Sequence, residues 1–259
     1  MSMNPADPAS AGFRHARARG EGVPAPRDRA LAQVISSVLG RCGDEALPPG
    51  GVERAARDAV SYLRPALELL RDLRGSDRLV WDGLVHRRLR LVPPAAGPAR
   101  STAQPRLVTA RRGGWELTEV TATACGWQTT IWLARRDGDS PRLQEVSPRA
   151  GTVPSRMGDA GHRLLVRDED VWTWVSASGD DNRIHLEPGA GRGIGLTAHD
   201  GVVVHGMLLA ALSLALVPAR DGLDARLVAP VVVDGAAELR ASPNGDLYGA
   251  DGLVLRRRS

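Results

Sequence analysis

The sequence predicts an α+β fold, because both halves of the chain place helical patterns ahead of strand-like runs. In the first half, apolar residues recur at helical spacing over residues 30–39 and 52–73, and four strand-like runs follow. The second half contains an apolar helical run over residues 206–217, and three more strand-like runs follow it. Periodicity alone leaves several α+β arrangements open.

The helix expected at residues 52–73 is the strongest in the first half, because its apolar residues form one stripe. Pro65 is expected to kink or split it, and Gly75 to end it. The strand-like runs that follow occupy residues 79–92, 104–109, 115–124 and 127–134. The last two are expected to pair as an antiparallel hairpin through Cys125 and Gly126.

In the second half, the pattern predicts a strand over residues 162–166 and a helix over residues 169–177, capped by Asp168. A long irregular segment separates this helix from the apolar helix at residues 206–217. The strands that follow are expected near residues 226–233, 236–241 and 247–257.

Two segments without periodicity indicate where the chain divides. Residues 1–28 are expected to form a disordered tail, because a segment rich in Ala, Pro, Gly and Arg buries too little surface to offset the entropy of ordering. Residues 135–154 are polar, contain Gly and Pro, and indicate a linker. The predicted domains are therefore residues 29–150 and residues 151–259.

Composition excludes several classes of protein. The chain has 259 residues, of which 42% are apolar and 25% charged, as is ordinary for a soluble globular protein. No run approaches the roughly 20 apolar residues of a membrane span, and the N-terminus lacks the apolar core of a secretory signal. Cys42 and Cys125 form neither a disulfide framework nor a metal-binding pattern, so a reducing cytoplasm is the expected location.

Positive charge is concentrated in the first half of the chain. All 34 basic residues are arginines. Residues 1–150 hold 23 of them and 16 acidic residues, a net charge of +7, whereas residues 151–259 hold 11 and 14, a net charge of −3. The arginines are scattered and aromatic residues make up only 3%, so nucleic-acid binding is not expected. An acidic partner such as an acyl carrier protein fits the basic surface better.

One segment of the second half carries a pattern of catalytic groups. It places a carboxylate, Asp180, and an imidazole, His185, five residues apart after a Ser-Gly break, and His205-Gly206-Met207 then opens the apolar helix. A carboxylate and an imidazole can orient water and exchange its proton near neutral pH. Free amides at a helix start favour negative charge. The spacing therefore predicts an acid/base pair facing a backbone oxyanion site.

This motif resembles the signature of the MaoC-like family of (R)-specific enoyl-thioester hydratases and dehydratases, which have the hotdog fold. The matching positions are Trp174, Ser178, Gly179, Asp180, Asn182, Ile184, His185, His205, Gly206 and Met207. The resemblance covers residues 162–217 and implies a sheet wrapped around the helix at residues 206–217. Because the first half loosely repeats the order of elements, a double hotdog with a degenerate N-terminal half is expected, an arrangement known among relatives of this family.

The resemblance also implies an activity. It is the interconversion of trans-2-enoyl and 3-hydroxyacyl thioesters, carried on coenzyme A or an acyl carrier protein. Asp180 and His185 are then the acid/base pair, and the Gly206 amide holds the thioester oxygen. No metal and no other cofactor is required.

The remaining motif residues are expected to support this pair. Ser178 and Asn182 are expected to hold the loop by hydrogen bonds, and His205 to have a structural role beside the glycine. His86 and His162, as isolated histidines, are assigned no function.

Arg183 stands where the family has a proline, so the loop lacks the restraint of a proline ring. An ion pair with Asp181 or Glu187 that braces the loop is favoured over a contact with a phosphate of the carrier arm.

Two other functions are compatible with the motif. A non-catalytic hotdog subunit or acyl-binding partner of a dehydratase would account for Arg183 and for the divergent first half. An oxa-Michael cyclase of natural-product biosynthesis would use the same acid/base pair with an internal hydroxyl in place of water. A homodimer, or a heteromer with another hotdog protein, is compatible with each.

Overall fold

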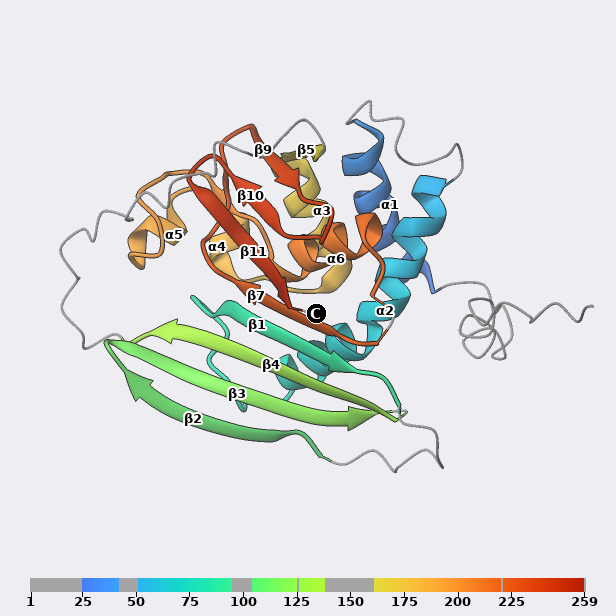
Figure 1. The fold of residues 1–259 in the computed structure, drawn as a ribbon. Helices are drawn as coiled ribbons and strands as arrows, with labels where there is room; N and C mark the ends of the chain where they lie inside the picture. The colour runs from blue at the N-terminus through green and yellow to red at the C-terminus, as the bar shows by residue number, and fades with distance from the viewer. Residues whose placement is uncertain are drawn as a thin grey trace, which may run out of the picture.

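The protein is built around one long antiparallel sheet that curves over its helices (Figure 1). The computed structural model describes residues 25–41, 51–94, 104–124, 126–137, 161–219 and 221–258. Within these residues the sheet has nine strands, in the order β2-β3-β4-β1-β7-β11-β10-β9-β5. Their bounds are β1 (Val85–Val92), β2 (Arg106–Arg112), β3 (Trp115–Ala124), β4 (Trp127–Arg136), β5 (His162–Arg167), β7 (Leu223–Leu227), β9 (Ala236–Ala241), β10 (Leu247–Gly249) and β11 (Gly252–Arg258). A separate small sheet pairs β6 (Val202–Val203) with β8 (Val232–Val233).

Helix α6 lies at the centre of the molecule. The helices of the described residues are α1 (Pro26–Gly40), α2 (Gly51–Arg74), α3 (Asp168–Ser178), α4 (Arg183–Leu186), α5 (Ala190–Gly193) and α6 (Gly206–Leu216). Every residue of α6 from Gly206 to Ala215 is buried, and the helix contacts α1, α2 and β1. An apolar helix enclosed by a sheet is the arrangement expected of a hotdog. In the described part of the chain, no helix is both long and apolar enough to cross a membrane.

Strands β1 and β7 join the two halves of the chain edge to edge. Their register pairs Leu89 with Ala225 and Leu91 with Leu223, and all four side chains are buried. Strands β1 to β4 come from the first half, and the other five strands of the sheet come from the second. One hydrophobic cluster includes residues of both halves, so the halves share a core.

The predicted hairpin is confirmed. Strands β3 and β4 pair from Ala124 and Trp127 at the turn to Trp115 and Arg136 at the open end. At Gly126 φ is 82°, a left-handed conformation in which a side chain is strained. The first predicted strand is shorter than expected, because β1 begins only at residue 85.

Helix α2 runs through Pro65 as one element, so the expected split does not occur. Leu63, Ala66 and Leu69 surround the proline in sequence and are buried in the core. Tertiary packing of this apolar face outweighs the backbone hydrogen bond that proline removes.

Helix α1 begins at Pro26, so residues 26–28 belong to a helix and not to the expected disordered tail. Proline suits the first turn, because its missing N–H would have no partner within the helix. Asp28 in the same turn forms an ion pair with Arg64 of α2 at 2.8 Å. The rest of the expected tail and most of the expected linker lie outside the described residues.

Helix α3 is held at its start by Asp170 rather than by the predicted cap, Asp168. The Asp170 carboxylate accepts a hydrogen bond from the Arg167 N–H at 2.8 Å and forms an ion pair with Arg41 of α1. The Asp168 carboxylate accepts only from the next N–H along the chain, at 3.2 Å. The buried Asp170 is favoured, because its carboxylate both accepts a hydrogen bond at the start of α3 and forms an ion pair with α1.

Separating the two halves is expected to expose apolar surface. A fragment of residues 151–259 loses the β1 partner of β7 and the α1 and α2 neighbours of α6. We expect this fragment to bind a hydrophobic dye and to lack a cooperative thermal transition. Co-expression with residues 1–150 should reverse both properties. A monomeric fragment that unfolds cooperatively without binding dye would refute the shared core.

Candidate active site

Gly179 turns the chain at the end of α3 and directs Asp180 inward. Gly179 has left-handed angles, with φ 72° and ψ 24°, and its N–H donates to the Val175 carbonyl at 2.8 Å. The Asp180 N–H donates to the same carbonyl at 3.2 Å. This left-handed ending explains the Ser-Gly break before the carboxylate. Asp180 is left only 7% exposed.

Four groups surround the Asp180 carboxylate. Its Oδ1 accepts from Trp81 Nε1 at 2.8 Å and from the Asn182 N–H at 3.1 Å. Its Oδ2 accepts from His205 Nε2. Arg74 Nη1 lies 3.9 Å from Oδ1. Burial acts to raise the pKa of Asp180, but the hydrogen bonds that it accepts from His205 and Trp81 hold it below its usual range. The carboxylate is therefore ionised at neutral pH.

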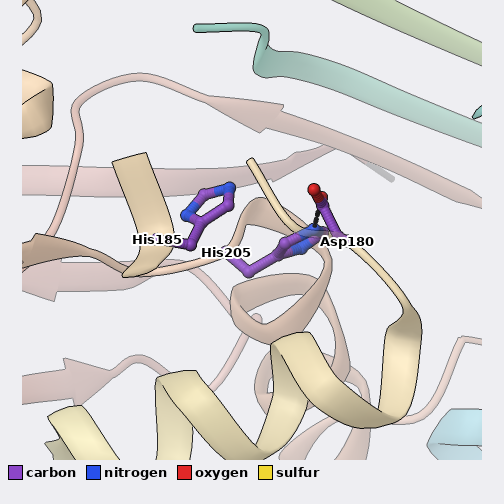
Figure 2. Close-up of side chains that lie close together, drawn as sticks. All are labelled: Asp180, His185 and His205. Carbon is purple, nitrogen blue, oxygen red and sulfur yellow. Dashed lines mark hydrogen bonds and ion pairs between the residues drawn. The ribbon is translucent and has the colours of Figure 1, made fainter. Parts of the chain in front are cut away.

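His205 has a fixed tautomer in this arrangement. It caps the start of α6, and its Nδ1 accepts from the Met207 N–H at 3.1 Å. A ring nitrogen that accepts carries no proton, so Nε2 bears the proton and donates it to the Asp180 carboxylate. Figure 2 shows this contact, which links the loop after α3 to the start of α6. The structural role expected for His205 therefore has two parts, a helix cap and a contact with Asp180.

His185 lies on α4 beside this pair, and its ring centroid is 4.7 Å from that of His205 (Figure 2). Its Nδ1 is 2.7 Å from the Val203 carbonyl, which can only accept, so Nδ1 carries the proton and Nε2 has a free lone pair. Burial lowers the pKa of His185 to about 4. The ring is therefore neutral at pH 7 and can act as a base.

Gly206 offers a backbone N–H to a ligand. As the first residue of α6 it has no hydrogen-bond acceptor inside the helix. A Cβ at this position would lie 2.8 Å from His86 Cβ and 3.0 Å from Leu227 Cδ1, so glycine alone fits without displacement. An N–H at the positive end of a helix dipole suits an oxygen that gains negative charge.

Asn182 fastens the motif loop to the first half of the chain. Its Oδ1 accepts from the N–H groups of Gly83 at 3.1 Å and Ile184 at 3.4 Å, and its Nδ2 donates to the Leu84 carbonyl at 2.6 Å. The Ser178 hydroxyl donates to a carbonyl one turn earlier in α3, at 3.2 Å. Asn182 thus joins two distant segments, whereas Ser178 bonds only within its own helix.

Two clefts lie beside these residues. The larger cleft, of about 450 Å³, is lined by His86, His185 and Gly206 together with apolar side chains. The smaller cleft, of about 280 Å³, is lined by Asp180 and His205. Asp180 and His185 therefore line different clefts, although a carboxylate oxygen and a ring nitrogen of the two lie within 4.8 Å of each other. One water molecule with hydrogen bonds of about 2.8 Å spans such a gap.

Asp180, His185 and His205 also form a set of possible metal ligands. One ligand atom from each lies within 4.8 Å of the others, and a set of one carboxylate and two imidazoles suits a divalent transition metal. Both nitrogens of His205 are engaged, however, and a metal ion would have to replace the proton between Nε2 and Asp180. The hydrogen bonds therefore favour proton transfer over metal binding.

Two residues of the first half that sequence analysis did not assign reach the site. Trp81 donates to Asp180 from 99 residues earlier in the chain. His86, on β1, lines the larger cleft, and its ring centroid lies 5.0 Å from that of His205. No local spacing connects them to the motif, because the fold alone brings them together. His162 lies on β5 and lines neither cleft.

Comparisons with solved structures identify the fold. The match to a MaoC-like dehydratase covers 89% of this chain and 91% of the dehydratase chain, at 15% identity and a TM-score of 0.51. The match to the full-length peroxisomal multifunctional enzyme type 2 from Drosophila melanogaster covers 88% of this chain and 45% of the enzyme chain. The identity is 14% and the TM-score 0.53. No family model and no curated protein matches the sequence. The chain has the α+β hotdog fold of MaoC-like dehydratases.

Arg183 forms its ion pair with Glu187. Arg183 Nε lies 3.0 Å from both carboxylate oxygens, and Nη2 lies 2.7 Å from Oε2. The two side chains are 63% and 53% exposed, so the pair braces α4 from the outside. Asp181, the other expected partner, pairs with Arg74 instead.

Arg183→Pro is expected to leave the fold and the site intact. Arg183 is the first residue of α4, and Asn182 before it has φ −58° and ψ 124°. These conformations suit a proline and the residue that precedes it. The exposed ion pair that is lost contributes little to stability. Thermal unfolding should give the same midpoint for Arg183→Pro as for wild type, and a lower one for Arg183→Gly. A lower midpoint for the proline variant would contradict this account.

Lowering the pH from 6.5 is expected to destabilise the protein through His185. Its folded pKa of about 4 lies below the ordinary value of 6.5, so between these values the unfolded chain binds a proton that the folded chain does not. The contribution of His185 to the free energy of unfolding is complete above pH 6.5 and falls by up to about 1.4 kcal/mol per pH unit towards pH 4. Urea unfolding at pH 7, 6 and 5 measures this slope. His185→Gln should reduce it, whereas His199→Gln, at an exposed position, should not.

Proposed function

We propose that the protein is a hydro-lyase that interconverts trans-2-enoyl and 3-hydroxyacyl thioesters. The observation that carries the proposal is an ionised carboxylate, Asp180, within 4.8 Å of a neutral imidazole, His185. Gly206 lines the same cleft as His185, and its N–H has no acceptor within α6. The fold, that of MaoC-like dehydratases, supports the same class of reaction.

In the hydration direction, Asp180 orients a water molecule and His185 Nε2 takes a proton from it. The water oxygen bonds to carbon 3 of the enoyl group, and the π electrons move toward the thioester oxygen. The His185 imidazolium then returns the proton to carbon 2. Asp180 is not the proton donor in this scheme, because its hydrogen bonds keep it ionised. Such acid/base assistance is worth about 10²- to 10⁴-fold.

The thioester oxygen carries negative charge between these two steps. Gly206 is suited to bind it, because its N–H lies at the start of α6, where the helix dipole and the unpaired donor act together. Closely packed neighbours keep this position a glycine, so no side chain of residue 206 itself lies between its N–H and an acyl group. Dehydration follows the same steps in reverse.

The proposed substrates are acyl thioesters of coenzyme A or of an acyl carrier protein. The larger cleft combines apolar walls for an acyl chain with Arg87. The net positive charge of the first half favours an acidic carrier. A homodimer, or a heteromer with another hotdog protein, and a cytoplasmic location are part of the proposal, and neither a metal nor nucleic acid is.

The proposed division of labour follows the two halves of the chain. Residues 29–150 form a degenerate hotdog-like unit, and residues 151–259 carry the catalytic motif. In support, each half contributes its own stretch of the sheet, and the motif residues all come from the second half. The first half supplies walls of the site through Trp81 and His86.

A non-catalytic acyl-binding subunit is the second candidate. One observation favours it: Asp180 accepts three hydrogen bonds and lines a different cleft from His185, so its lone pairs are largely engaged. Such a subunit would bind acyl thioesters without turnover and would restore activity to a paralogue on mixing. An oxa-Michael cyclase would use the same residues, and a substrate with an internal hydroxyl distinguishes it.

Turnover of crotonyl thioesters tests the proposal. We expect Asp180→Asn and His185→Gln each to lower kcat/KM by about 10²- to 10⁴-fold, because each removes one member of the pair. The measurement is the loss of enoyl absorbance with coenzyme A and acyl-carrier-protein substrates.

Asp200→Asn and His199→Gln are the matched controls, because these residues are exposed and line neither cleft. Both should retain wild-type turnover, and a chelator should not change it. Turnover that persists unchanged in Asp180→Asn and His185→Gln would show that another site does the chemistry.

A further inference from the structure

We propose that His86, on the first half of the chain, is the second hydrogen-bond donor to the thioester oxygen, beside the N–H of Gly206. The inference rests on the proposed function and deepens it, because it names a substrate contact outside the catalytic motif. The degenerate half then takes part in the chemistry as well as in packing.

His86 is placed by an irregularity in strand β1. In the pairing of β1 with β4, His86 lies opposite Leu133 and Arg88 opposite Trp132, so Arg87 is an extra residue. Such a β-bulge re-aims side chains and is common beside active sites. Successive residues of a regular strand point to opposite faces, yet His86 and Arg87 line the same cleft.

The bulge brings His86 against the oxyanion site. The His86 Cβ is the atom that leaves no room for a side chain on Gly206, with 2.8 Å to an ideal Cβ there. The same cleft is lined by His185. A thioester oxygen bound to the Gly206 N–H therefore lies next to the His86 side chain.

His86 has an unused hydrogen-bonding atom. Its Nε2 is buried and has no partner. Four other side-chain atoms of the described residues share this property, but none belongs to a residue that lines the larger cleft. Buried polar atoms are normally paired, so an unpaired one at a cleft calls for a ligand that satisfies it.

The chemistry of His86 suits a donor and not a base. Burial lowers its pKa to about 3, so the ring is neutral and holds one N–H. A neutral imidazole can polarise a carbonyl oxygen without giving up its proton. Two donors to one oxygen stabilise the developing charge more than one. No bond to His86 forms or breaks.

His86→Ala and His86→Gln test the inference, with His199→Ala as the matched control at an exposed histidine. We expect His86→Ala to lower kcat on crotonyl thioesters by about 10²- to 10³-fold, with a much smaller change in KM. His86→Gln keeps an N–H and should recover part of the loss, which a purely structural role would not produce. Thermal midpoints show whether each variant folds. If His86→Ala does not fold, the ring signals of His86 in the wild-type protein, measured as described next, decide the inference.

A second measurement separates this inference from the proposed function. The ring ¹⁵N signals of His86 are followed while butyryl-pantetheine, a saturated thioester that cannot be hydrated, is added. We expect the His86 signals to move and those of His199 to stay. Wild-type protein that binds this probe through His86 but hydrates no enoyl thioester would contradict the proposed function alone. An unmoved His86 signal, or wild-type kcat in a folded His86→Ala, would overturn the role of His86.

Discussion

The buried contact between Asp180 and His205 fixes the geometry of the site. Because His205 Nδ1 caps α6, its Nε2 must carry the proton that the Asp180 carboxylate accepts. The same contact joins the end of α3 to the start of the central helix. Removal of either partner would leave a buried polar group without its hydrogen bond, which costs about 1–3 kcal/mol or more. The same pair of side chains therefore both stabilises the fold and sets the geometry of the site.

The seam between β1 and β7 is the second constraint. It brings the turn before β1 under the motif loop, where Asn182 bonds Gly83 and Leu84. The motif loop is thus held by backbone groups of the half that carries no motif. The first half contributes none of the motif residues, but its turn before β1 and the bulge in β1 fix where the motif loop lies.

Patterns in the sequence predicted those features of the structure that depend on residues close together in the chain. Helix periodicity, the β3–β4 hairpin and the spacing of the motif residues all act within short stretches. The structure brings Asp180 within 4.8 Å of His185 and places His185 and Gly206 at one cleft. Trp81 and His86 could not be found in this way, because their positions depend on a strand pairing between distant segments. The choice of Asp170 over Asp168 depends likewise on Arg41, more than a hundred residues earlier.

The pairing of β1 with β7 also has a consequence for folding. Arg88 and Asp224, which form an ion pair across this seam, are 136 residues apart, so their contact closes a very long loop. Contacts of such separation form slowly, because the entropy of loop closure is lost before the pairing is gained. During synthesis the first half emerges well before the motif, so the edge of β1 that pairs with β7 stays unpaired until the second half is made. The candidate site is therefore completed by a late folding event, and a folding intermediate with only one half formed lacks it.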